Sequence, residues 1–116
     1  MLRVQHLLQD KGSEVWSIDA EEPVLRAIQI MADKHIGALP VMRGTELTGV
    51  VSERDYARKV ILMGRSSAET AVWEIMSSPV VTVTRDESVH DCMQIMTERR
   101  IRHLPVVEKG NLIGMV

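Results

Sequence analysis

The chain has 116 residues, enough for one domain with a modest core, and 45% of them are hydrophobic, which excludes an intrinsically disordered protein. The formal net charge of −2 gives no electrostatic basis for nucleic-acid binding. No apolar run reaches the length of a membrane span and the N-terminus does not resemble a signal peptide, so we expect a cytoplasmic protein with no membrane partner.

The reactive residue types are sparse. Cys92 is the single cysteine, which excludes an intrachain disulfide, and it lies in an apolar helical pattern that predicts a buried side chain. The four histidines lack the spacing of a metal site. No set of nucleophile, base and acid is apparent, so we expect neither an enzyme nor a metal requirement.

The first half of the chain predicts strand, helix, strand, turn, strand and helix. After a short β-prone run at Val15–Ile18, apolar residues at spacings of three and four predict a helix from Val24 to Lys34. Strands are predicted over Leu39–Met42 and Thr48–Ser52, and a helix over Glu53–Met63 that ends at Gly64. Because Pro40 cannot donate to a ladder, its strand is expected at a sheet edge or with an irregular start, which leaves a carbonyl near Ala38 open to a ligand.

The second half predicts the same order after a short helix at Val72–Met76 and a start at Pro79. A helix is expected over Val89–Arg100, with Val89, Cys92, Met93 and Met96 on its buried face. Ser88 with Asp91 three positions later has the spacing of a capping box. Strands are predicted over Leu104–Val107 and Ile113–Val116.

The two halves are copies of one another. A shift of 65 positions aligns Val15–Val51 with Val80–Val116 without a gap, and 13 of the 37 pairs are identical, most of them apolar or turn residues. We therefore divide the chain into a first repeat at 1–70, with a short N-terminal helix, and a second at 71–116. The second repeat contains no counterpart of the Glu53–Met63 helix. A repeat this short rarely buries its apolar face alone, so two packed units with clefts between them are expected.

The duplicated motif resembles the tandem CBS domain pair, or Bateman module. The resemblance is carried by Ile36–Val41 with Leu47–Asp55, and by Ile101–Val106 with Leu112–Val116. It implies an α/β (α+β) fold, a pseudo-twofold tandem of two β-α-β-β-α units of which the second lacks its last helix. It also implies regulation of another protein, no catalysis, frequent dimerisation, and clefts that bind adenosine-containing ligands such as AMP, ADP, ATP, NAD or S-adenosylmethionine.

Ser52 and Asp55 form the sharpest motif, because they lie where a strand passes into a helix. A hydroxyl and free amides at a helix start attract phosphate, and a carboxylate one turn later can accept both hydroxyls of a ribose. The same spacing is also that of a simple capping box. The resemblance favours the ligand interpretation, since the family places its phosphate and ribose contacts at these two positions.

Arg102 and His103 replace Gly37 and Ala38 of the first repeat and add a cation and a titratable group at the start of a strand. The resemblance implies that this segment completes the cleft of Asp55, with Arg102 facing the phosphate. One phosphate-binding cleft per chain is therefore expected. The remaining predicted contacts are Thr82, Val83, Ile36, Ala38, Pro40 and Val51, for which plain core positions are the alternative. Arg54, Arg58 and Lys59 are expected on a solvent face.

Three hypotheses follow. The first is a regulatory module that senses an adenine nucleotide and acts in trans on an unidentified protein, as a homodimer. The second is a structural dimerisation module with no physiological ligand, for which an Asp55→Ala change would alter nothing that a ligand reports. The third is an enzyme that turns over ATP or NAD, which we rank last because no base or metal-binding carboxylate set supports it.

Overall fold

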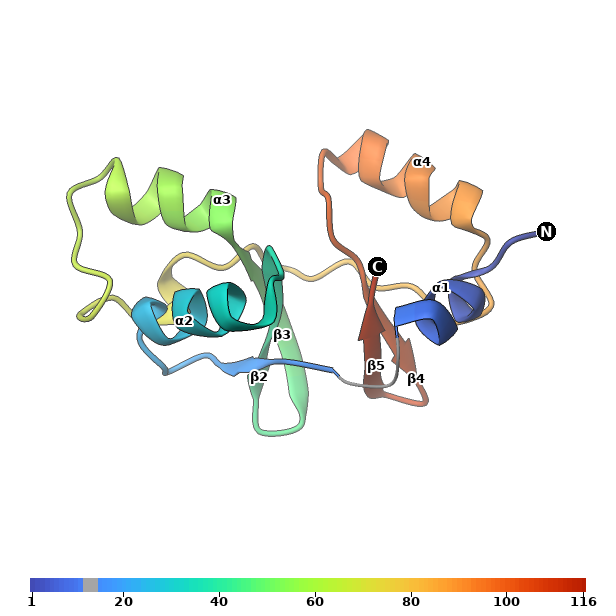
Figure 1. The fold of residues 1–116 in the computed structure, drawn as a ribbon, viewed down its shortest axis with the longest axis horizontal. Helices are drawn as coiled ribbons and strands as arrows, with labels where there is room; N and C mark the ends of the chain where they lie inside the picture. The colour runs from blue at the N-terminus through green and yellow to red at the C-terminus, as the bar shows by residue number, and fades with distance from the viewer. Residues whose placement is uncertain (12–14) are drawn as a thin grey trace. The chain divides into compact units, whose positions relative to one another are not determined.

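The chain folds into two compact units. The computed structural model describes residues 1–11 and 15–116, coloured from blue at the N-terminus to red at the C-terminus in Figure 1. One unit is Trp16–Val80, and the other combines Met1–Val15 with Val81–Val116. Each unit joins helices to a small sheet, which confirms the α+β prediction.

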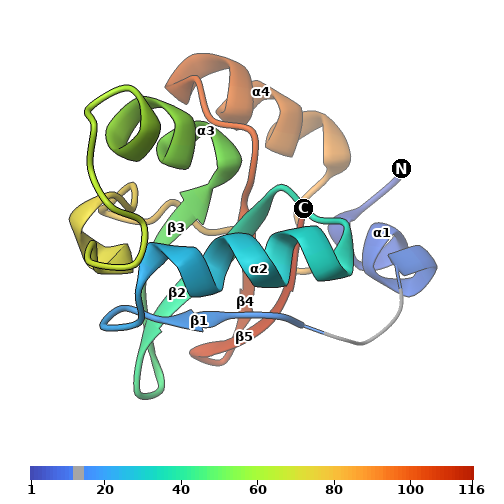
Figure 2. The ribbon, with the colours of Figure 1, turned by 60° about the vertical axis from the view of Figure 1, so that its left-hand side comes forward.

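The unit Trp16–Val80 is built on a three-stranded sheet. In chain order its elements are β1 (Ile18–Asp19), α2 (Val24–Lys34), β2 (Ala38–Arg43), β3 (Glu46–Ser52), α3 (Glu53–Tyr56), the π-helical turn η1 (Ala57–Ile61) and the 3-10 turn η2 (Val72–Glu74). The central strand β2 is parallel to β1 and antiparallel to β3. Figure 2 shows α2 lying along this sheet, and its residues Val24, Ala27 and Met31 are buried in the same core as Leu39, Val41 and Val51.

Pro40 lies in the central strand β2, so of the two expectations for this strand, a sheet edge or an irregular start, the sheet edge was wrong. Pro40 is opposite Val50 of β3, whose N–H and C=O both bond to Ser77 on the other side of that strand. Pro40 and Val50 therefore form no backbone hydrogen bonds with each other. The ring nitrogen of Pro40 faces β1 instead, and the pairing of β2 with β1 begins only at the next residue, Val41. A central proline is tolerated because no N–H is required there.

The second helix of this unit changes its winding along its length. Only Glu53–Tyr56 is α-helical, and the next five residues form a π-helical turn in which the amides of Leu62 and Arg65 donate to carbonyls five residues earlier. The expected helix over Glu53–Met63 is therefore present as a mixed helix that ends two residues early. Gly64 follows in the left-handed region, with a φ of 66°.

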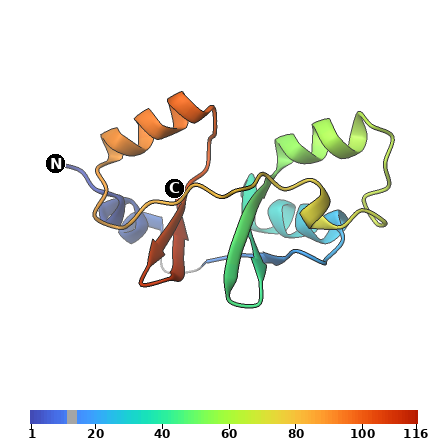
Figure 3. The same cartoon turned by 180° about the vertical axis from the view of Figure 1, so that it is seen from behind.

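The other unit has a two-stranded antiparallel sheet. Its elements are α1 (Val4–Lys11), α4 (Val89–Arg99), β4 (Pro105–Glu108) and β5 (Asn111–Met115). Val83 adds one parallel bridge to Val106, and the core consists of Val4, Val83, Cys92, Leu104 and Val106. In Figure 3 the dark blue helix α1 lies beside the red β4–β5 hairpin. The side chain of Leu8 in α1 packs against Gly114 in β5.

The segment that opens each repeat packs on the unit of the other repeat. The amide of Val4 donates to Glu87 at 2.9 Å, so the N-terminal helix belongs with residues 81–116. The amides of Val72 and Trp73 donate to Glu22 and Ala20, so η2 belongs with the first repeat. The compact units therefore differ from a division at residue 70, because each contains the opening segment of the other copy.

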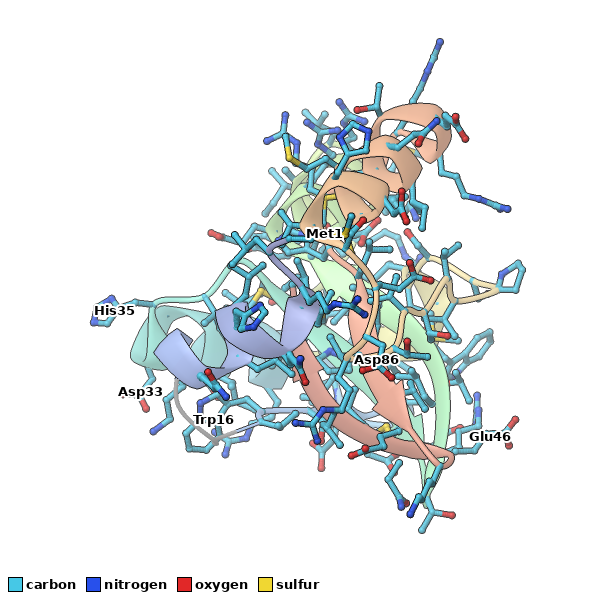
Figure 4. All side chains as sticks on the ribbon, turned by 90° about the vertical axis from the view of Figure 1, so that its right-hand side faces the viewer. Met1, Trp16, Asp33, His35, Glu46 and Asp86 are labelled. Atoms are coloured by element: carbon cyan, nitrogen blue, oxygen red, sulfur yellow. The ribbon has the colours of Figure 1, made fainter. Side chains whose placement is uncertain are left out.

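The two long helices end in the same way. His35 and Arg100 occupy equivalent repeat positions, and both have a φ of 56° while their amides donate to Met31 and Met96. Figure 4 shows His35 projecting from the end of α2. The start of α4 is capped by Ser88, whose Oγ accepts the amide of Asp91 at 3.0 Å. Met93 is 62% exposed, so its expected place on the buried face was wrong.

Candidate functional site

The β2–β3 hairpin presents Ser52 at its open end, where α3 begins. Ala38 is the cross-strand neighbour of Ser52. The carbonyl of Gly37 accepts the amide of Glu53 at 3.0 Å, which joins the start of β2 to the first turn of α3. The structure thus brings the predicted site residues Ala38, Ser52 and Asp55 together at one end of the hairpin.

Ser52 and Asp55 form a reciprocal capping box. The Oγ of Ser52 accepts the amide of Asp55 at 3.2 Å, while Oδ2 of Asp55 accepts the amide and the hydroxyl of Ser52, each at 2.9 Å. Asp55 is only 8% exposed, although it carries a carboxylate. The capping interpretation of the motif is confirmed, and it fixes the orientation of the carboxylate.

Lys59 is a member of this site that the sequence did not assign to it. Its Nζ lies 3.0 Å from Oδ1 of Asp55 and donates to the carbonyl of Ile75 at 2.9 Å. The side chain of Lys59 is 45% exposed, so its expected place on a solvent face is confirmed, and its ammonium nevertheless bonds within the site. The four-residue spacing between Asp55 and Lys59, which places both on one helix face, was the available signal.

The apolar candidates of this unit are mostly core residues. Val51 is fully buried within the cluster that contains Leu39 and Val41, Pro40 is fully buried, and Ala38 is 6% exposed. Ile36 is half-buried and packs against that cluster. Their contribution in this unit is to hold the hairpin that carries Ser52.

The other four candidates lie in the unit that contains Val81–Val116. Val83 is 4% exposed and belongs to that core, whereas Thr82 is exposed. Arg102 is exposed at the turn before β4, and His103 is half-buried and already engaged in an interaction.

Metal-binding clusters and reactive thiols are the next features to consider among the described residues. No cluster of three histidine, cysteine or acidic side chains suited to a metal ion occurs over residues 1–11 and 15–116. Burial and the nearby carboxylates of Glu87 and Asp91 raise the pKa of the Cys92 thiol, which is 1% exposed as predicted. A thiol of this kind is a poor nucleophile. In the same part of the chain, no helix has the length and apolar character that crossing a membrane requires.

Comparison with known proteins defines the class, a tandem pair of small α+β domains. The CBS domain model matches residues 12–62 and 72–116. The chain is 42% identical over 110 residues to the CBS domain-containing protein CBSX3, mitochondrial, of Arabidopsis thaliana, which covers 90% of this chain and 53% of that protein. The chain therefore spans about half the length of that relative.

Solved structures show the same fold. The crystal structure of the CBS domain protein NE2398 has a TM-score of 0.92 and 43% identity, covering 98% of this chain and 89% of that one. The CBS domain pair of MJ0100, in complex with 5′-methylthioadenosine and S-adenosyl-L-methionine, has a TM-score of 0.87 and 23% identity over 100% of this chain and 89% of that one. The chain belongs to the CBS domain family and contains two copies of the domain.

Proposed function

We propose that this chain is a regulatory module that binds an adenine nucleotide through Ser52 and Asp55. Asp55 would accept a ribose hydroxyl at Oδ1, and Ser52 would contact phosphate. Arg102 and His103 are proposed to supply the further phosphate contacts, with Thr82 and Val83 beside the ligand. The ligand is AMP, ADP, ATP or NAD, and the module acts in trans on a partner that the chain itself does not identify. We propose a cytoplasmic location, although the name of the Arabidopsis relative places that protein in mitochondria.

The observation that carries this proposal is the preset carboxylate of Asp55. A carboxylate offers about four acceptor positions, and three donors are placed on this one. The capping box turns Oδ2 toward Ser52, so Oδ1 is the oxygen with remaining capacity. The MJ0100 domain pair, whose likeness to this chain at 23% identity is one of fold, binds adenosine compounds and supports the ligand class.

Calorimetric titration of the whole chain with AMP, ATP, NAD and S-adenosylmethionine tests the proposal. Asp55→Asn keeps the size of the side chain but removes its charge, and we expect affinity to fall at least about tenfold, as charge-assisted hydrogen bonds are lost. Glu69→Gln, an exposed change of the same kind, is the matched control and should bind like the wild type. Unchanged affinity in Asp55→Asn, or no binding of any ligand to the folded wild type, would contradict the proposal.

A second candidate is a structural dimerisation module. The end of η1 and the turn after it expose Ile61, Leu62 and Met63 by 56%, 76% and 69%, which is the kind of apolar surface that a homodimer would cover. Sedimentation of the wild type beside a variant with all three residues changed to serine tests this role. A monomeric wild type at micromolar concentration would exclude it.

A further inference from the structure

Lys59 connects two parts of the unit Trp16–Val80 that lie far apart in the chain. Its stem begins in η1, and its ammonium bonds both Oδ1 of Asp55 and the carbonyl of Ile75. Ile75 is fully buried in the core of this unit. The ammonium therefore joins the carboxylate of the candidate site to the segment 72–77.

The segment 72–77 flanks β3 at the strand edge away from β2. Ser77 exchanges both backbone hydrogen bonds with Val50, at 2.9 and 3.2 Å, and Met76 lies against Gly49. The amide of Met76 donates to Val72 at 3.1 Å. These bonds hold the segment beside the strand that ends at Ser52, and Lys59 is the side chain that joins it to Asp55.

The third N–H of Lys59 allows Lys59 and Asp55 together to bind a hydroxyl group. An ammonium carries three donors, of which two are placed on Asp55 and Ile75. A ribose hydroxyl both donates and accepts, so it can donate to Oδ1 of Asp55 while it accepts the third N–H of Lys59. Such a hydroxyl would fix the ammonium in place and strengthen its bond to Ile75.

We propose that Lys59 is a positioning residue that recognises the ribose together with Asp55 and transmits its binding to the segment 72–77. The inference rests on the proposed function, since it concerns the same site. The segment leads within a few residues to Val81, where the chain enters the other unit. A ligand can shift only an equilibrium whose states it binds differently. The two states here are the segment 72–77 with and without the bond from Lys59 to Ile75, and the ribose would bind more tightly to the state in which that bond is formed.

Amide hydrogen exchange of the whole chain, with and without saturating AMP, tests the inference. In the wild type we expect AMP to slow exchange of the Met76 and Ser77 amides about threefold, the size typical of a half-exposed charged contact. Lys59→Met should exchange about threefold faster without ligand, and AMP should leave its rates unchanged. Lys59→Arg, which keeps the cation, should restore the response.

Two controls separate transmission from stability alone. Arg58→Met removes a neighbouring exposed cation from the same helix and should respond to AMP like the wild type. The 2′,3′-dideoxy analogue of AMP, which has no ribose hydroxyls, should leave the Met76 and Ser77 amides unchanged at saturation. A structural role without transmission would alter the free rates of Lys59→Met but preserve its response to AMP.

The outcomes are distinct. AMP that binds the wild type without slowing exchange over 72–77, or that slows it equally in Lys59→Met, overturns the role of Lys59 and leaves the proposed function intact. AMP that does not bind the folded wild type overturns both for this nucleotide.

Discussion

The repeated glycines Gly49 and Gly114 offer a sharp test of how the opening segments pack. A Cβ added at Gly49 would lie 2.8 Å from Sδ of Met76 and 2.8 Å from the carbonyl oxygen of Ser77. The thioether can rotate away, but the carbonyl belongs to backbone that is bonded to Val50. In Gly49→Ala the segment 72–77 must therefore move away from β3.

The size of the effect can be worked from these contacts. Overpacking costs about 1–3 kcal/mol, and each weakened backbone bond between Val50 and Ser77 costs up to about 1 kcal/mol. Alanine in a strand recovers about 0.5–1 kcal/mol relative to glycine. Because one displacement relieves the clash and weakens the bonds together, we expect Gly49→Ala to lower the free energy of unfolding by about 2 kcal/mol.

Urea denaturation measures this loss. Trp16 and Trp73 both lie in the unit Trp16–Val80, so tryptophan fluorescence follows the unfolding of that unit. A loss of about 2 kcal/mol corresponds to a midpoint lower by about 1 M urea for a small domain. Gly114→Ala is the matched control, and because its unit contains neither tryptophan its unfolding is followed by far-ultraviolet circular dichroism. The added Cβ would meet the methyl groups of a flexible Leu8 side chain rather than a backbone carbonyl, so its loss should be about half as large or less. Equal losses, or no loss in Gly49→Ala, would refute this reasoning.

Two further predictions concern stability. His35→Gly should raise the free energy of unfolding by about 0.5–1 kcal/mol, because glycine adopts the left-handed φ of 56° without strain, and a lower urea midpoint would instead reveal a contact made by the imidazole. The backbone hydrogen bond from Ala71, and then the side chain of Arg65, lower the pKa of Glu74. The ionised Glu74 therefore stabilises the folded state above its unfolded pKa, and this stabilisation is lost as pH falls through the lower folded pKa. Between pH 6 and pH 3 the melting temperature of the wild type should therefore fall further than that of Glu74→Gln, and parallel curves would contradict this origin.

Local patterns predicted the fold well where neighbouring residues decide the outcome. The 3.6-residue period of apolar residues predicted the bounds of α2 correctly and those of α4 to within one residue. This succeeds because a helix with one buried face must have apolar residues at that spacing. The edge position expected for Pro40 failed because a proline excludes only its own N–H, and which side of the strand that nitrogen faces depends on partners such as Val50.

The candidate site also contains one contact that local sequence predicted and one that it could not predict. The contact between Ser52 and Asp55 spans three residues and follows from a capping pattern, so the sequence predicted its geometry. The bond from Lys59 to Ile75 spans sixteen residues and depends on where η2 packs, which no local spacing reveals. The roles of Thr82, Val83, Arg102 and His103 in ligand binding stay predictions.

Because the segment that opens each repeat packs in the unit of the other repeat, the two units can fold at different times during translation. Trp16–Val80 is one continuous stretch, so it can fold as soon as residue 80 has left the ribosome. The other unit joins residues 83 positions apart, such as Arg3 and Asp86, and its helix α1 must wait for residues 81–116 before it can pack. Closing so long a loop is costly in entropy and slow, so α1, with the exposed Leu2 just before it, is the part of the described chain with the longest period of exposure to chaperones or to a second nascent copy.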